Sequence, residues 1–193
     1  MQHLLTPHAH TIEPYVWWEG AFTEQELNWL QSKAKQAEQN AQIGIGSNGS
    51  VNPNVRRSQV SWLTNTPDTK WVFEKLAEVV SKMNAQHYRF DLTGFGEPLQ
   101  LTNYDQSENG MYEWHQDYGA GVSRKVSITV QLTDPSEYEG GNLQISTSGQ
   151  PQNVRKQRGF IAIFPSYVLH QVTPVTQGSR QSLVAWVSGP PFK

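Results

Sequence analysis

The sequence NYDQSENGMYEWHQDY, from Asn103 to Tyr118, contains a histidine and an aspartate two positions apart, His115 and Asp117. In an extended strand, residues i and i+2 point to the same face roughly 7 Å apart, so both side chains can reach one metal ion. His170, which follows an apolar run that begins at Phe160, can supply a third ligand. Two histidines and one carboxylate form the facial triad of non-haem iron sites, which leaves coordination positions open for chemistry. The sequence therefore predicts a metal site made of His115, Asp117 and His170.

A later strand pattern carries an arginine. From Arg180 to Val187 the residues alternate, so that Arg180, Ser182, Val184 and Trp186 share one face of a strand. A guanidinium directed into a barrel stays charged and therefore requires an anionic partner. We expect Arg180 to bind an anion and Trp186 to line the same pocket.

The order of the elements predicts a mainly β fold with supporting helices. Thr23 and Glu26 form a capping box before an apolar helical stripe, and Thr66 followed by Pro67 signals the start of a second helix. Six strand-like runs follow, separated by Gly, Pro, Asn or Asp. They are Tyr88–Leu92, Leu99–Tyr104, Val126–Leu132, Asn142–Ser146, Phe160–Phe164 and Leu183–Val187. This order predicts a double-stranded β-helix, a jelly-roll type of barrel, with the N-terminal helices packed on one sheet.

Composition narrows the class of protein. A chain of 193 residues with 36% hydrophobic residues can bury one sizeable core, so we expect a single domain over residues 1–193. A net charge of −2 gives no broad positive field, which argues against duplex nucleic acid as a partner. The chain has no cysteine, which excludes disulfides. No apolar stretch approaches the ~20 residues that span a bilayer, and we expect a cytoplasmic location; the oligomeric state stays open.

These motifs resemble those of the Fe(II)- and 2-oxoglutarate-dependent dioxygenases, and within them the prolyl 4-hydroxylase-like branch that includes the bacterial PKHD-type hydroxylases. The segment from Leu169 to Arg180 is similar to the family block with the distal histidine and a basic residue. The resemblance extends over most of the chain. The residues that match the block Tyr…Gly-x-Tyr-x-x-His-x-Asp are Tyr104, Gly110, Tyr112, His115 and Asp117.

The resemblance implies a set of cofactors. Fe(II) would be held by the three predicted ligands, Arg180 would pair with the far carboxylate of 2-oxoglutarate, and O₂ would be the oxidant; a role for ascorbate is left open. Tyr104 is the candidate for a hydrogen bond near the metal end of 2-oxoglutarate. In the strand Arg124–Thr133 the polar face, which includes Ser127 and Gln131, is expected to line the co-substrate pocket. Gln131 stands where the oxygen-sensing prolyl hydroxylases carry a tyrosine.

The resemblance also suggests where a substrate would bind. The run from Arg56 to Trp62 looks like the strand that follows the mobile substrate loop of that branch. Arg56 and Arg57 are therefore candidates for the wall of the substrate channel, and Tyr112 and Trp114 are further candidates.

Two connecting segments complete the comparison. Gly44–Asn54 has little apolar content, and a solvated connection and a lid over the iron are equally acceptable interpretations. Glu139–Leu143 looks like the family's hairpin between the two motif blocks.

The function implied by the resemblance is hydroxylation of a peptidyl or amino-acid side chain, with prolyl as the favoured target and a peptide or protein as the partner. One alternative is an oxygenase of a small molecule or nucleotide, but the repair dioxygenases of alkylated bases carry more arginines after the distal histidine than the single Arg180 present here. Another is a non-catalytic metal-binding barrel, which would retain buried ionisable groups without use, at a cost in stability.

Overall fold

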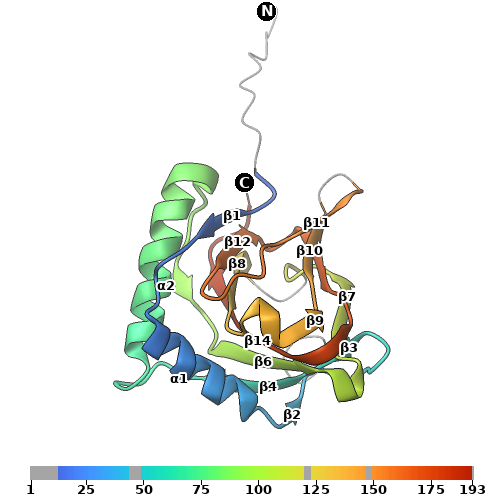
Figure 1. Ribbon diagram of the computed structural model, residues 1–193. Helices are drawn as coiled ribbons and strands as arrows, with labels where there is room; N and C mark the ends of the chain where they lie inside the picture. The colour runs from blue at the N-terminus through green and yellow to red at the C-terminus, as the bar shows by residue number, and fades with distance from the viewer. Residues whose placement is uncertain (1–12, 44–48, 120–122, 147–148, 193) are drawn as a thin grey trace, which may run out of the picture.

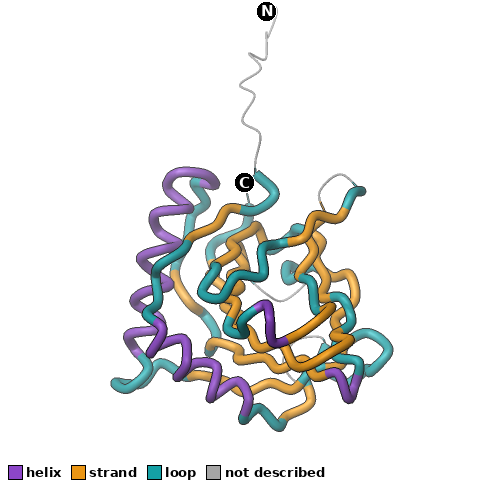
Figure 2. Tube along the Cα trace, in the orientation of Figure 1, coloured by secondary structure: helices purple, strands orange, loops and turns teal. Residues whose placement is uncertain are grey.

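Two antiparallel β-sheets face one another and form the frame of the protein (Figure 1). The computed structural model describes residues 13–43, 49–119, 123–146 and 149–192. In Figure 2 the two long helices lie on one side of the strands, outside the larger sheet. This arrangement confirms the predicted barrel of jelly-roll type with helices on one sheet.

The larger sheet has nine strands. In spatial order its main path is β1 (Val16–Trp18), β12 (Ile161–Pro165), β8 (Arg124–Gln131), β14 (Val175–Ser188), β6 (Leu99–Asp105), β4 (Gln59–Leu63) and β2 (Gln39–Asn40). Two short strands, β5 (Gly94–Phe95) and β9 (Tyr138–Gly140), each pair with β14. β14 therefore pairs with four strands and is the centre of the sheet.

The smaller sheet has five strands. Their order is β11 (Pro151–Asn153), β10 (Leu143–Ser146), β13 (Leu169–Val172), β7 (Met111–His115) and β3 (Arg56–Arg57). β7 and β13 are neighbours in this sheet, so the two motif blocks of the sequence lie side by side.

Two helices cover the outer face of the larger sheet. Helix α1 (Glu24–Lys35) begins with the predicted capping box, in which the Thr23 hydroxyl accepts from Glu26 N and the Glu26 carboxylate accepts from Thr23 N. Helix α2 (Lys70–Met83) begins after a turn at 67–69 and not at Thr66, because the Thr69 hydroxyl accepts from Thr66 N and closes that turn. Short helices are η2 (Asn84–Tyr88), η3 (Gln106–Glu108) and η4 (Pro135–Glu137).

Strict alternation on the central strands divides the apolar core from the polar interior. On β14, Leu183, Ala185 and Val187 pack toward the helices with the apolar faces of α1 and α2. Burial of a valine or leucine side chain contributes about 1.5–3 kcal/mol to stability. A shift of the strand by one residue would expose the whole set, so this burial fixes the register. The intervening residues of β14 therefore face the space between the sheets.

A second apolar cluster lies between the two sheets. Its members include Tyr104, Leu143, Phe164 and Val172. The polar residues of β8 and β14 face the same space between the sheets.

The predicted strand Tyr88–Leu92 is wrong. The chain continues α2 into a π-helical turn, and Arg89 then adopts a left-handed conformation with φ 56°. The Asn84 amide pairs with both the N–H and the C=O of Phe90 at 2.9 Å. A side chain thus satisfies the backbone groups that a strand neighbour would have satisfied.

The predicted strand Phe160–Phe164 corresponds to β12, which pairs with β8 in the larger sheet, and His170 lies on a separate strand, β13, which pairs with β7 and β10 in the smaller one. One further prediction needs correction. Glu139–Leu143 is not a hairpin, because β9 pairs with β14 while β10 pairs with β11 and β13. In both cases the chain crosses between sheets.

Part of the segment Gly44–Asn54 lies outside the described residues, namely 44–48. At its described edge, Ser50 and Ile43 exchange two backbone hydrogen bonds of 2.9 Å. Among the described residues, no helix combines the length and the apolar composition needed to cross a bilayer.

Candidate metal centre

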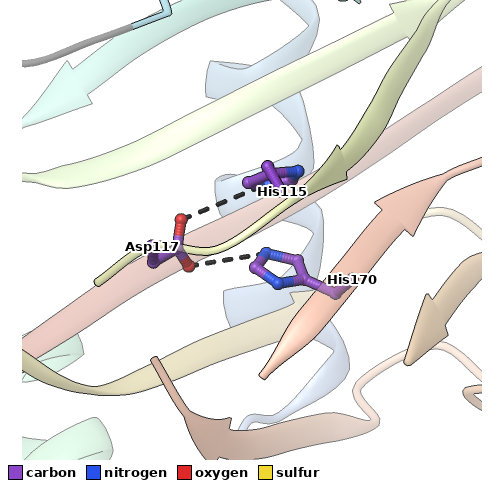
Figure 3. A group of neighbouring side chains, drawn as sticks. All are labelled: His115, Asp117 and His170. Atoms are coloured by element: carbon purple, nitrogen blue, oxygen red, sulfur yellow. Dashed lines mark ion pairs between the residues drawn. The ribbon is translucent and has the colours of Figure 1, made fainter. Parts of the chain in front are cut away.

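The three predicted ligands come together inside the barrel. His115 is the last residue of β7, and its register partner on β13 is His170. Asp117 lies just beyond β7, where its backbone N–H donates to Ser166 O at 2.9 Å. Figure 3 shows the carboxylate between the two imidazoles. One potential ligand atom from each residue lies within 4.8 Å of the other two.

Backbone carbonyls orient both imidazoles. Nδ1 of His115 is 2.7 Å from Glu113 O, and Nδ1 of His170 is 3.0 Å from Val168 O. A carbonyl oxygen only accepts hydrogen bonds, so each Nδ1 carries the proton and each Nε2 presents its lone pair. These Nε2 atoms lie 3.8 and 3.5 Å from the Asp117 carboxylate oxygens (Figure 3).

The ionisation states also suit a cation. Burial lowers the pKa of His115 to about 3, with a further contribution from the charge of His170, so His115 is neutral at pH 7. Burial would raise the pKa of Asp117, but the two histidines and a hydrogen bond from Ser127 hold it at about 2. At His115 and Asp117 the site therefore offers a neutral nitrogen and an ionised carboxylate, which are the forms in which these residues bind a metal ion.

Ser127 was expected to line the co-substrate pocket, and it contacts a candidate ligand instead. Its hydroxyl donates to Asp117 Oδ2 at 2.7 Å and lies 3.0 Å from the Ser166 hydroxyl. Ser127 and Asp117 are ten residues apart in the chain, and β8 brings them together because its polar face points into the barrel. Ser127 therefore orients the carboxylate.

Arg180 is the largest fully buried side chain of the described residues, with 1% of its surface exposed. Its Nη2 donates to Gln131 Oε1 at 2.9 Å. Its Nε and Nη1 are buried and have no hydrogen-bond partner among the described residues. A buried cation with two free donors in a fixed plane matches the two oxygens of a carboxylate.

A cavity of about 290 Å³ connects the metal centre with Arg180. Its wall contains the three candidate ligands and, as the alternation on β14 predicts, Arg180, Ser182, Val184 and Trp186. Gln131 does not line this cavity and reaches it only through Arg180. One compartment thus offers a metal-binding end and an anion-binding end.

Tyr104 also lines the cavity. It is the register partner of Arg180 on β6, and its ring centre lies 5.6 Å from the guanidinium carbon. The structure brings its ring to the anion-binding end. The hydrogen bond from Tyr104 to the metal end of 2-oxoglutarate stays a prediction.

The four substrate candidates divide into two pairs. Arg56 is 7% exposed, donates to Gln100 Oε1 at 2.8 Å, and lies 4.6 Å from the ring centre of Tyr112. The Tyr112 ring stacks on His115 with centres 3.5 Å apart. Both residues line the cavity. Arg56 is therefore a buried side chain with protein partners, and not a solvated surface charge.

Arg57 and Trp114 lie away from the cavity. The Arg57 guanidinium donates to the backbone carbonyls of Asn109 and Pro53 at 3.1 and 2.8 Å. Trp114 is 37% exposed and is not part of the cavity wall. Both residues alternate with a neighbour that does face inward, and this alternation is what turns them outward.

Arg124 is a cavity residue that the sequence did not indicate. Two of its nitrogens donate to the Glu97 carboxylate at 2.6 and 2.5 Å, and its guanidinium carbon lies 3.8 Å from the centre of the Trp186 ring. The register of β8 and β14 shifts at Val187. A bulge of this kind changes which side chains face inward, so alternation alone could not have found Arg124.

Comparison with known proteins gives matches by sequence. Residues 99–188 match the family model described as the 2OG-Fe(II) oxygenase superfamily. A PKHD-type hydroxylase of Hyphomonas neptunium is 31% identical over 147 residues, which make up 75% of this chain and 65% of that relative. One of Teredinibacter turnerae is 28% identical over 152 residues, with the same coverage. The chain thus spans just under two thirds of the length of these curated relatives.

Solved structures match over most of the chain. A prolyl-4-hydroxylase of Pseudomonas putida has a TM-score of 0.71 and 17% identity, covering 92% of this chain and 94% of that one. A prolyl hydroxylase from Trichoplax adhaerens, in complex with a hypoxia inducible factor oxygen degradation domain peptide fragment, has a TM-score of 0.75 and 16% identity, covering 91% and 84%. At these identities the likeness shows a shared fold.

Proposed function

We propose that the chain is an Fe(II)- and 2-oxoglutarate-dependent dioxygenase that hydroxylates a peptidyl or amino-acid side chain, with proline as the favoured target. The match of residues 99–188 to the 2OG-Fe(II) oxygenase superfamily and the similarity to PKHD-type hydroxylases support this proposal. One observation carries the proposal. A cluster of two imidazoles and a carboxylate shares a cavity with a buried arginine, two of whose donors have no partner in the part of the chain that the structure describes.

The residues present fit both groups that the family uses. His115, Asp117 and His170 would hold Fe(II), since two imidazoles and a carboxylate make the facial set that this metal takes in oxygenases. Arg180 would hold the far carboxylate of 2-oxoglutarate, which would supply the anion that Nε and Nη1 otherwise lack. When bound, iron and 2-oxoglutarate supply the oxidation of a C–H bond by O₂, with succinate and CO₂ as products.

The protein contributes orientation and exclusion of water. The carbonyls of Glu113 and Val168 hold the two imidazoles in one tautomer, and Ser127 holds one carboxylate oxygen. Tyr104, Leu143 and Val172 of the second apolar cluster form part of the cavity wall. These contacts keep the site organised before any ligand arrives, which is where the protein's share of the catalysis lies.

A peptide is the partner that the cavity wall supports best. Arg56, Tyr112 and Trp62 line the cavity, and Trp62 is 43% exposed with its ring centre 6.5 Å from that of Trp186. Aromatic faces suit the rings and aliphatic parts of peptide side chains, and an arginine suits their carbonyl oxygens. One structural neighbour was solved with a peptide fragment bound.

The test is turnover with a defined metal and co-substrate. The protein, reconstituted with Fe(II) without oxygen, is given 2-oxoglutarate, O₂ and a library of proline-containing peptides, and succinate and peptide masses are followed. We expect succinate together with the gain of one oxygen atom on a peptide. His170→Ala is the matched control and should give neither. Absence of succinate formation by the iron-loaded wild type with any peptide or amino acid would refute the proposal.

A further inference from the structure

Beside Arg180 there is a second buried polar group that the proposed function does not use. Tyr138 is 4% exposed, and its hydroxyl is buried without a hydrogen-bond partner among the described residues. Two Arg180 nitrogens are in the same condition. A buried polar atom without a partner costs about 1–3 kcal/mol, so three of them at one place indicate a ligand that accepts hydrogen bonds.

The strand register brings the two side chains together. Tyr138 on β9 is the register partner of Gly178 on β14, and Arg180 follows two residues later on the same face. Gly141 confirms their proximity, because a β-carbon built there would lie 3.1 Å from Arg180 Cδ and 3.3 Å from Tyr138 Cε2. The phenol ring and the arginine stem therefore flank the Gly141 backbone.

The ring is held in place and stays protonated. The Lys156 ammonium lies 4.6 Å from the ring centre and donates to Gly140 O at 2.6 Å, so it ties the ring to the end of β9. Burial raises the pKa of Tyr138, which outweighs the opposite effect of the adjacent Arg180 side chain, through both its charge and its hydrogen-bonding. At neutral pH the hydroxyl is therefore a hydrogen-bond donor.

Gln131 cannot take this role. Its Oε1 accepts from Arg180 Nη2 at 2.9 Å, and the amide must keep this orientation because its NH₂ would face another donor. A carboxylate at the anion-binding end would therefore meet Arg180 from β14 and a phenol from β9, while the Gln131 oxygen on β8 is already in use.

We propose that the Tyr138 hydroxyl donates a hydrogen bond to the far carboxylate of 2-oxoglutarate beside Arg180, and that it helps the site select 2-oxo acids with a second carboxylate. The inference rests on the proposed function, from which it differs by naming a binding residue outside both motif blocks. It also explains why the structure keeps a phenol at a position where phenylalanine would leave no unpartnered atom.

The experiment compares two ligands in two variants. Tyr138→Phe removes only the hydroxyl, and Tyr15→Phe is the matched control, since Tyr15 packs against the second apolar cluster and does not line the cavity. Dissociation constants for 2-oxoglutarate and for 2-oxopentanoate, which has the same carbon chain without the far carboxylate, are measured by calorimetry on the anaerobic Fe(II) protein. Thermal unfolding without ligand is measured in parallel.

Tyr138→Phe should weaken 2-oxoglutarate binding by roughly 10- to 150-fold, the range of a hydrogen bond to a charged group. Its affinity for 2-oxopentanoate should match the wild type, and its melting temperature without ligand should not fall. Tyr15→Phe should bind both acids as the wild type does. An unchanged affinity of Tyr138→Phe for 2-oxoglutarate, or an equal loss for both acids, would overturn the role of Tyr138 alone. Wild-type protein that binds no 2-oxoglutarate would refute the proposed function as well.

Discussion

Replacing Arg180 by methionine should separate co-substrate binding from stability. Methionine keeps most of the length of the side chain and removes the charge. Arg180 has one protein partner, Gln131, and two donors that have none among the described residues. We therefore expect Arg180→Met to lose affinity for 2-oxoglutarate while the ligand-free protein unfolds almost as the wild type does.

The two magnitudes follow from these contacts. Truncating one member of a buried charge pair costs about 2–5 kcal/mol, which corresponds to roughly 30- to 4,000-fold in the dissociation constant of 2-oxoglutarate. In the free protein, removing a buried ion in favour of an apolar group is neutral or stabilising by about 1–4 kcal/mol. The unpaired Gln131 oxygen subtracts about 1–3 kcal/mol. The free energy of unfolding should therefore fall by no more than about 3 kcal/mol.

The assay combines ligand titration with denaturation. 2-Oxoglutarate is titrated into the anaerobic Fe(II) protein while the visible absorption of the complex is followed, and the ligand-free protein is unfolded in urea. Arg180→Lys keeps the charge without the planar fork, so its dissociation constant should lie between those of the wild type and Arg180→Met. Adding Gln131→Leu to Arg180→Met removes the unpaired oxygen and should recover stability without restoring binding.

Either measurement can refute this reasoning. An unchanged dissociation constant in Arg180→Met would mean that the far carboxylate binds elsewhere in the cavity. A loss of more than about 3 kcal/mol in the free protein would match a buried ion that is fully paired, and Arg180 would then be a structural residue.

The other predictions concern the metal centre and the backbone around it. Alanine at any one of the candidate ligands, His115, Asp117 or His170, should abolish tight Fe(II) binding in equilibrium dialysis while far-UV circular dichroism stays unchanged; two variants that bind iron normally would contradict the ligand set. Ser127→Ala removes the hydrogen bond to the carboxylate and should weaken Fe(II) binding by about 10- to 100-fold, whereas equal affinity would show that the carboxylate needs no support. Gly141→Ala places alanine in a left-handed conformation at φ 55° and puts its β-carbon close to Arg180 Cδ. The variant should therefore have a lower melting temperature and a lower affinity for 2-oxoglutarate. A variant with neither loss would refute the close approach of Gly141 to Arg180.

Local sequence patterns predicted much of the fold and the three residues of the metal centre. The capping box at Thr23 uses atoms three residues apart, and alternation on β14 separates Arg180 from Leu183 by the geometry of a single strand. His115 and Asp117 are two positions apart in an extended segment, so the sequence alone places their side chains on the same face. These features depend on distances within one element, which is why the sequence determines them.

Contacts between elements could not be obtained in this way. The Asn84 side chain makes the hydrogen bonds to the Phe90 backbone that a neighbouring strand would otherwise make. A register shift near Val187 accompanies the inward placement of Arg124. Tyr138 reaches Arg180 only through the register of β9 against β14. The sequence contains each of these residues, but their partners are set by which strands pair and in which register. Burial of the whole apolar core determines that pairing, and no single segment does.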